Sequence, residues 1–247
     1  MPTPPQIPAL KLDGELIETV ITYKYLGAWV DRKLCWNIHA KKKISEAKQA
    51  LGTLSRCRRY LPPSVTRLVY KTVIQPKFLY ATTITYPKNK NDQIAFEYVN
   101  KYAASLISDR HIGTYDDCIK SATLDPIWKI SAGRRLSLFR AYVDNMRYVP
   151  DNYLSALEAP HRLGLRSSAS RPDENRIKFA QPIDSRRVQC ERTALSHMIH
   201  IWNSLSNSFS QLSYNVFKNK IKNGEILSYL MEAKVLTPLD VPVRHST

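Results

Sequence analysis

The sequence predicts a mainly α-helical protein that begins with an antiparallel β-hairpin. Over residues 9–31 apolar and polar side chains alternate, which is typical of strands that bury one face. From Asn37 onward the apolar residues recur every three or four positions, which places them on one face of a helix. We therefore expect a hairpin over residues 9–36 and helices after it.

In the hairpin region, Asp13 and Gly14 form a turn signal, and Ile21, Tyr23, Tyr25 and Trp29 alternate on one face. Aromatic side chains in this pattern usually pack in a core, so we expect these to be buried; stacking on a nucleotide is the alternative. A lone hairpin is marginal in water. This one should therefore pack on the following helices or on a partner.

Five helices are expected in the central region. Residues 37–60 carry Ile44, Ala47, Leu51 and Leu54 on one stripe, and Pro62 and Pro63 end this helix. The second helix begins near Ser64 and should kink or end at Pro76, which has no backbone N–H to donate. The others cover about residues 92–108 and begin near residues 117 and 131.

These patterns suggest five regions: a proline-rich tail (1–8), the hairpin (9–36), a helical domain (37–160), a linker rich in Ser, Pro and Arg (161–185) and a C-terminal segment (186–247). In the last region we expect Trp202 to be a core aromatic and Phe217 to anchor a short helix that Ser213 caps. Direct contact of this region with nucleic acid through Lys218, Lys220 and Lys222 is the alternative.

The charge balance points to a polyanion as partner. The chain has 37 Lys and Arg against 21 Asp and Glu, a formal charge of +16. Its seven glycines lack the spacing of a phosphate-binding loop, which excludes mononucleotide binding of that kind. No apolar run is long enough to span a bilayer. We expect an intracellular protein, in the nucleus or cytoplasm, that binds nucleic acid and no membrane.

Half of the excess charge lies in residues 32–67, where ten Lys and Arg accompany one acid, Glu46. A solvated helix face normally mixes both signs, so this segment favours a surface that follows phosphates without reading bases. A merely solvated face is the alternative. The residues expected to contact the backbone are Lys41, Lys42, Lys48, Arg56 and Arg59.

No catalytic or metal-binding constellation stands out. Tyr115, Asp116 and Asp117 resemble a polymerase Y-x-D-D turn, but the spacing differs and helices precede them. Thr114 and Asp117 instead have the spacing of a helix capping box. Cys190, His197 and His200 lack a fourth ligand for a closed zinc site. We expect no cofactor for the chain by itself.

Three stretches together resemble non-LTR (LINE-type) retrotransposon reverse transcriptases. Residues 23–39 contain KYLG followed by Asp31, Trp36 and His39, and residues 70–81 (YKTVIQPKFLYA) are similar to a helix of the same family. Residues 202–218 match its WN and FK block near the C-terminus. Each motif alone is weak to moderate, but their order is specific.

The resemblance implies that Lys24, Tyr25, Leu26 and Gly27 belong to the hairpin that grips the primer end, and that the following helices form the thumb that holds the template–primer duplex. The palm with its catalytic aspartates, which needs Mg²⁺ in the complete enzyme, is expected upstream of KYLG and is not found in this sequence. The expected function is that of the nucleic-acid-holding portion of an RNA-directed DNA polymerase, catalytically incomplete by itself. A stand-alone basic nucleic-acid-binding module and a helical interaction protein are the alternatives.

Overall fold

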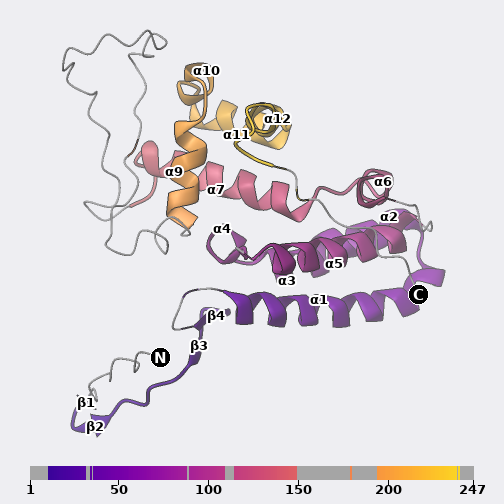
Figure 1. The fold of residues 1–247 in the computed structure, drawn as a ribbon. Helices are drawn as coiled ribbons and strands as arrows, with labels where there is room; N and C mark the ends of the chain where they lie inside the picture. The colour runs from indigo at the N-terminus through magenta and orange to yellow at the C-terminus, as the bar shows by residue number, and fades with distance from the viewer. Residues whose placement is uncertain are drawn as a thin grey trace.

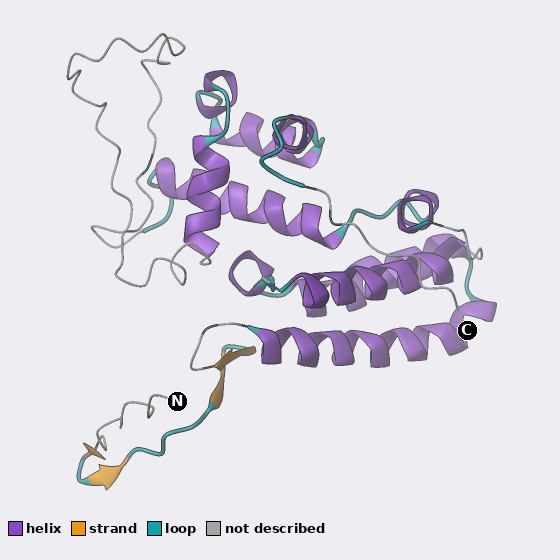
Figure 2. Ribbon diagram, viewed as in Figure 1, coloured by secondary structure: helices purple, strands orange, loops and turns teal. Residues whose placement is uncertain are grey.

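Helices make up most of the chain, and two short hairpins precede them, which confirms the expected fold class (Figures 1 and 2). The computed structural model describes residues 11–31, 34, 36–87, 89–108, 114–148, 179, 194–237 and 239. The expected tail (1–8) lies outside the described residues, as does all of the expected linker except Phe179.

Each hairpin has two strands. Strand β1 (Lys11–Leu12) pairs with β2 (Glu15–Leu16), and β3 (Thr22–Tyr25) pairs with β4 (Ala28–Asp31). Both turns have two residues with positive φ, Asp13 and Gly14 in the first and Leu26 and Gly27 in the second. Such turns match the right-handed twist of the strands they join. The turn expected at Asp13 and Gly14 is confirmed.

The expected burial of the hairpin aromatics is wrong for two of them. Tyr23 and Tyr25 are each 62% exposed, and Ile21 is 83% exposed. The expected single face is also wrong, because the register pairs Lys24 with Trp29 and so places Trp29 on the face opposite to Tyr23 and Tyr25. The Trp29 face meets α1 (Asn37–Cys57), where Lys42 lies over the ring, and the tyrosine face is left exposed. Trp29, like the rest of β4, is half-buried.

The first helical layer contains α1, a short 3-10 turn (Arg58–Tyr60), α2 (Pro63–Val69), α3 (Gln75–Leu79), α4 (Thr82–Thr85) and α5 (Lys90–Ser108). In α1 the buried stripe is Ala40, Ile44, Ala47, Leu51 and Leu54, which includes all four residues expected there. Figure 1 shows α1 lying along α3 and α5.

Pro76 changes the helix without ending it at once. Between α2 and α3 the backbone forms a π-helical turn (Tyr70–Ile74), and the Gln75 N–H bonds to the Tyr70 carbonyl five residues earlier. A regular helix would bring the Pro76 ring against the carbonyl of Thr72. The wider π turn relieves this contact, and the helix then ends at Leu79.

Helix α6 (Tyr115–Ser121) packs on α5. The remaining helices form a second layer: α7 (Ile127–Val143), α9 (Ala194–Asn203), α10 (Asn207–Ser210), α11 (Tyr214–Lys222) and α12 (Glu225–Glu232). Thr114 caps α6 as expected, because its hydroxyl oxygen accepts the Asp117 N–H at 3.3 Å. Ser213 occupies the N-cap position of α11 but makes no side-chain capping bond.

Buried apolar residues form two clusters, which divide within α7. The first joins α1–α6 and ends at Ile127; the second joins the rest of α7 to α9, α11 and α12. Trp202 and Phe217 are buried in the second, with ring centroids 6.0 Å apart, as expected. The second cluster thus includes part of the predicted helical domain (37–160) together with the C-terminal segment.

Glu97 on α5 is completely buried and joins three helices. Its carboxylate accepts the backbone N–H groups of Ile127 at 3.1 Å and Trp128 at 2.8 Å, at the start of α7, and the hydroxyl of Tyr115 on α6. Burial raises the pKa of Glu97, while these hydrogen bonds act in the opposite direction. The N-terminus of α7 also favours a negative charge at this place.

Replacing Glu97 should be among the most destabilising single changes. We expect Glu97→Ala to lower the free energy of unfolding by about 3 kcal/mol or more, because two buried N–H groups and a buried hydroxyl lose their acceptor. Tyr115→Phe removes one of these bonds and should cost about 1 kcal/mol. Urea unfolding followed by circular dichroism measures both, and equal losses would contradict a shared acceptor role for Glu97.

Candidate nucleic-acid interface

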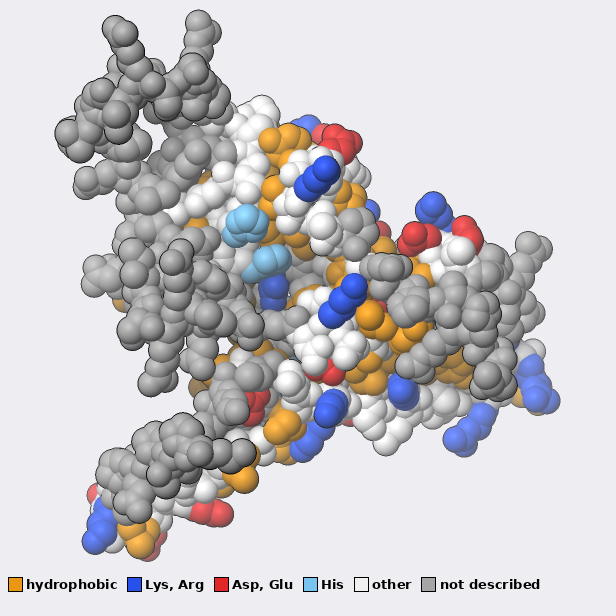
Figure 3. Space-filling view, in the orientation of Figure 1, with side chains coloured by type: hydrophobic (Ala, Val, Ile, Leu, Met, Phe, Trp, Pro, Cys, Tyr) orange, Lys and Arg blue, Asp and Glu red, His pale blue; other side chains and the backbone are white. Residues whose placement is uncertain are grey.

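The candidate interface is an exposed row of cations on α1 and the 3-10 turn after it, here named the α1 basic face: Lys41, Lys42, Lys48, Arg56 and Arg59. All five side chains are exposed. At 3.6 residues per turn they fall within roughly a third of the helix circumference, on the side away from the buried stripe. Figure 3 shows Lys and Arg side chains along the length of α1.

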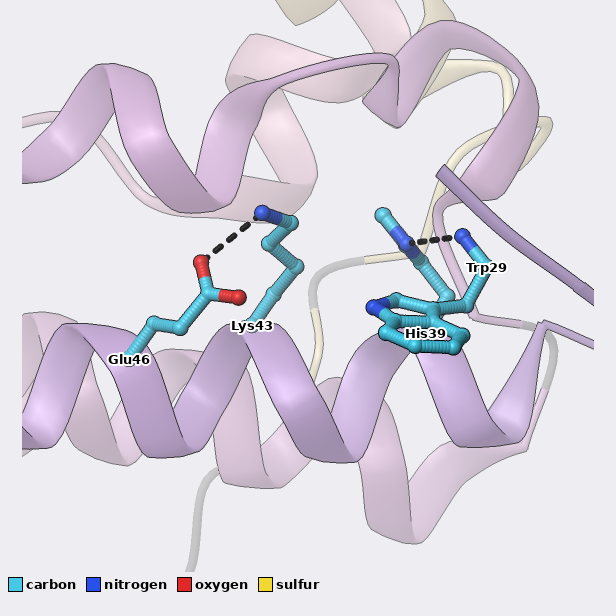
Figure 4. Close-up of polar contacts among 4 residues, drawn as sticks. All are labelled: Trp29, His39, Lys43 and Glu46. Carbon is cyan, nitrogen blue, oxygen red and sulfur yellow. Dashed lines mark hydrogen bonds and ion pairs between the residues drawn. The ribbon is translucent and has the colours of Figure 1, made fainter. Parts of the chain in front are cut away.

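The one acid of this segment does not neutralise the α1 basic face. Glu46 pairs with Lys43, whose Nζ lies 2.8 Å from the carboxylate (Figure 4). Among the residues that the structure describes, none of the five cations forms an ion pair. Their charge is therefore available to a ligand.

The β3–β4 hairpin brings one further cation, Lys24, to the start of α1. The Nζ of Lys42 lies 3.0 Å from the centroid of the Trp29 ring, and the Nζ of Lys24 lies 5.8 Å from it. An ammonium over an indole face is attracted by the ring electrons. Lys24 of the grip-like motif and Lys42 of the basic face thus meet at one aromatic ring.

His39 attaches the hairpin to α1. The backbone N–H of Trp29 donates to Nδ1 of His39 at 3.1 Å, and the His39 side chain is buried (Figure 4). Close by, the Trp36 N–H donates to the Asp31 carboxylate at 3.0 Å. Burial lowers the pKa of His39, and the charge of Lys43 lowers it further, while Glu46 acts in the opposite direction. The neutral ring is the form that can accept the Trp29 N–H.

Tyr80 holds the turn of the same hairpin. Its hydroxyl donates to the Leu26 carbonyl at 2.6 Å, and a Cβ at Gly27 would lie 3.3 Å from the Tyr80 ring. Gly27 has a φ of +82°, a conformation that side chains rarely adopt. The first two stretches that carry the family resemblance therefore touch each other, with Leu26 and Gly27 against Tyr80.

At the far end of α1 the structure adds a feature that the sequence reasoning missed. A pocket of about 390 Å³ is lined by Arg58 and Arg59, together with Ser55 and Thr66. The two guanidinium groups and the Ser55 hydroxyl are suitable donors for a phosphate, whereas the Thr66 hydroxyl donates to the Pro62 carbonyl at 3.2 Å. The run of three arginines at residues 56, 58 and 59 is the only sequence signal for it.

The structure places Asp116 and Asp117 in the first turn of α6, both exposed, and not on a strand hairpin. Tyr115 beside them is buried against Glu97. Within the described part of the chain, no group of three or more His, Cys, Asp or Glu side chains could hold a metal ion. Nor does that part contain a helix long and apolar enough to cross a membrane.

A comparison with protein-family models, curated proteins and solved structures finds no match to this chain.

Acid should weaken the attachment of the hairpin. Because the pKa of His39 is lowered in the folded protein, the unfolded chain binds the proton first, so this contribution to stability is present above pH 6.5 and is lost as pH falls below it. We expect the fall in unfolding free energy between pH 7 and pH 5 to be smaller in His39→Asn, whose amide oxygen can still accept the Trp29 N–H. Urea unfolding at the two pH values measures it.

Replacing His197 should have a larger effect on the pH dependence of stability. It is mostly buried on α9 with Nδ1 3.2 Å from Arg135, and its pKa is lowered to about 4, first by burial and then by the charges of Arg135 and His200. In His197→Asn, the fall in the free energy of unfolding between pH 6.5 and pH 4 should be smaller by up to about 3 kcal/mol. If neither variant changes the pH profile, the two lowered pKa values are wrong.

Proposed function

We propose that this chain holds the template–primer duplex of a LINE-type reverse transcriptase. It binds the phosphate backbone of an RNA–DNA hybrid or DNA duplex through the α1 basic face, and it does not polymerise DNA by itself. The observation that carries the proposal is the row of five exposed cations, which form no ion pair with any residue that the structure describes, beside a hairpin that carries Lys24.

The shape of this surface favours contacts with phosphates over contacts with bases. The cations project from the exposed side of α1 and the 3-10 turn after it, and long flexible side chains on such a surface can follow a backbone. Two guanidinium groups lining the pocket at Arg58 and Arg59 add a place for one phosphate. The expected binding is therefore tolerant of sequence and sensitive to salt.

The resembling stretches support the same proposal through their contacts. Gly27 and Leu26 lie against Tyr80, and Lys24 and Lys42 share the Trp29 ring. These contacts fix the grip-like hairpin at the start of the basic helix. In the family that the motifs resemble, the hairpin and the thumb hold the same duplex.

Two other functions remain as alternatives. A stand-alone basic module would bind nucleic acid in the same way without a polymerase partner. A helical interaction protein would use its charge for solubility only, and its binding to nucleic acid would not depend on particular cations. Salt-dependent binding separates the second alternative from the proposal.

Reversing three charges of the α1 basic face should weaken binding to every duplex sequence alike. If about five side chains meet phosphates, log K falls with log salt with a slope of about −4 to −5. Replacing Lys41, Lys48 and Arg59 by Glu should reduce the slope to about −2, because about three contacts are lost. Fluorescence anisotropy with a labelled blunt duplex, over a series of salt concentrations, measures the slope.

The matched control reverses three exposed lysines elsewhere, Lys11, Lys90 and Lys120, and so changes the net charge equally. This control should bind more weakly by a small factor but keep most of the slope. If both triple variants flatten the slope equally, only the overall charge matters, and the α1 basic face is a solvated surface.

The chain should not extend a primer on an RNA template with Mg²⁺ or Mn²⁺. Asp116→Asn with Asp117→Asn should leave primer extension at background and cost up to about 1 kcal/mol of stability, because the first turn of α6 loses its negative charge. A gel assay with a labelled primer tests this. Extension that the double variant abolishes would assign the catalytic role to these aspartates.

A further inference from the structure

A basic groove lies between α7 and α11, away from the residues of the α1 basic face. Its volume is about 820 Å³, and both helices line it. The two helices approach closely at Gly133, where a Cβ would lie only 3.0 Å from the side chain of Ile221. Even alanine at this position would require the Ile221 side chain to give by a few tenths of an ångström, so α7 and α11 are in close contact here.

Cations dominate the groove. Five line it against one acid, Asp125, a local balance of +4: Lys129, Arg134, Arg147, Lys218 and Lys222. The acid compensates little, since Asp125 is 3.9 Å from Lys129 and is itself 63% exposed. Arg134 is held in place by a 2.7 Å hydrogen bond from its guanidinium to the Leu79 carbonyl.

The lysines of α11 divide between two faces. Lys218 and Lys222, one turn apart, line the groove, and neither has an ion-pair partner within the described residues. Lys220 between them does not line the groove and pairs with Glu225 at 2.5 Å. The charge on the groove side is thus uncompensated, while the charge on the other side is neutralised.

The rest of the lining is apolar or can form neutral hydrogen bonds. Ile130, Leu138 and Ala141 contribute apolar surface, Tyr214 contributes an aromatic ring, and Asn215 and Asn219 contribute amides. Cations combined with an aromatic ring and apolar surface are the features that bind unpaired nucleic acid, with phosphates on the cations and bases against the rings.

We propose that this groove binds a few nucleotides of an unpaired nucleic-acid strand. A concave site of about 820 Å³ has the size of a site for a small ligand and is too small to admit a duplex. An unpaired strand can place its bases in the groove and its phosphates on Lys218 and Lys222. The site shares no residue with the α1 basic face, so the inference does not depend on the duplex-binding proposal.

The test compares two double variants with two probes. Lys218→Gln with Lys222→Gln removes the groove charges of α11, whereas Lys220→Gln with Lys234→Gln removes two charges outside the groove. Fluorescence anisotropy measures the affinity of each variant for a labelled 12-nucleotide oligothymidine and for a blunt duplex. Thermal unfolding checks that all variants remain folded.

We expect the groove variant to bind the oligothymidine about ten-fold more weakly at fixed salt, with the salt slope reduced by about 1.4, which is two contacts at about 0.7 each. Its affinity for the blunt duplex should change by less than about two-fold, and the control variant should change neither affinity by more than that. Tyr214→Ala should weaken oligothymidine binding without changing the slope, because stacking involves no phosphate.

Three results would overturn the proposal: unchanged oligothymidine affinity in the groove variant, an equal loss for the duplex, or equal competition by a polyglutamate peptide of matched charge. Failure of the duplex-binding proposal looks different. In that case the salt slope of duplex binding is unchanged in the variant with Lys41, Lys48 and Arg59 reversed, independently of the affinity for the oligothymidine.

Discussion

The buried carboxylate of Glu97 is the contact on which the arrangement of the helices depends. A charge that is fully removed from water is tolerated only when hydrogen bonds surround it, and Glu97 has donors from α6 and from the first turn of α7. Next to it, Asn100 accepts the Tyr70 hydroxyl at 2.7 Å and donates to the Asp125 carbonyl at 3.1 Å. One end of α7 is therefore fixed against α5, and α7 then passes into the second apolar cluster.

Not every arginine on α7 is available to a ligand. Arg135 donates to the Thr83 carbonyl at 2.9 Å, and Arg140 binds the Asp144 carboxylate at 2.8 Å and the Ser210 carbonyl at 2.5 Å. Arg140 also lies near the rings of Trp202 and Phe217. These buried guanidiniums hold helices together by donating to carbonyl oxygens. Arg134 is different, because one bond to Leu79 positions it while its side chain remains exposed at the groove. A count of basic residues alone cannot separate these two roles.

Local patterns predicted what depends on local structure, and missed what depends on packing between distant segments. The stripe of Ile44 and Leu51, the cap at Thr114 and the burial of Trp202 follow from periodicity and spacing, and all three are confirmed.

A single Glu in an amphipathic helix normally faces water, so nothing local marked Glu97 as buried. The groove needs Gly133 and Ile221, 88 positions apart, to meet. Alternation counted through the turn at Leu26 and Gly27 placed Trp29 on the face of Tyr23 and Tyr25, whereas the strand register places it opposite Lys24 and leaves the tyrosine face exposed. The interface residues Lys41, Lys42, Lys48, Arg56 and Arg59 do share one exposed face, and whether they bind phosphates stays a prediction.

The two basic surfaces differ in shape, and shape decides which form of nucleic acid each can accept. A convex helix with cations on one side can follow the backbone of a duplex, whose bases are turned inward and need no contact. A concave groove that combines cations with Tyr214 can accept bases only after they have left the stack, which costs less in an unpaired strand because no base pair is broken. Because Glu97 and the shared helix α7 connect the two layers, both surfaces are carried by one framework. A nucleic acid in which duplex continues into an unpaired strand presents both forms at once, as a primed template does. The two proposals are independent, and on such a ligand each surface is assigned the part that its shape favours.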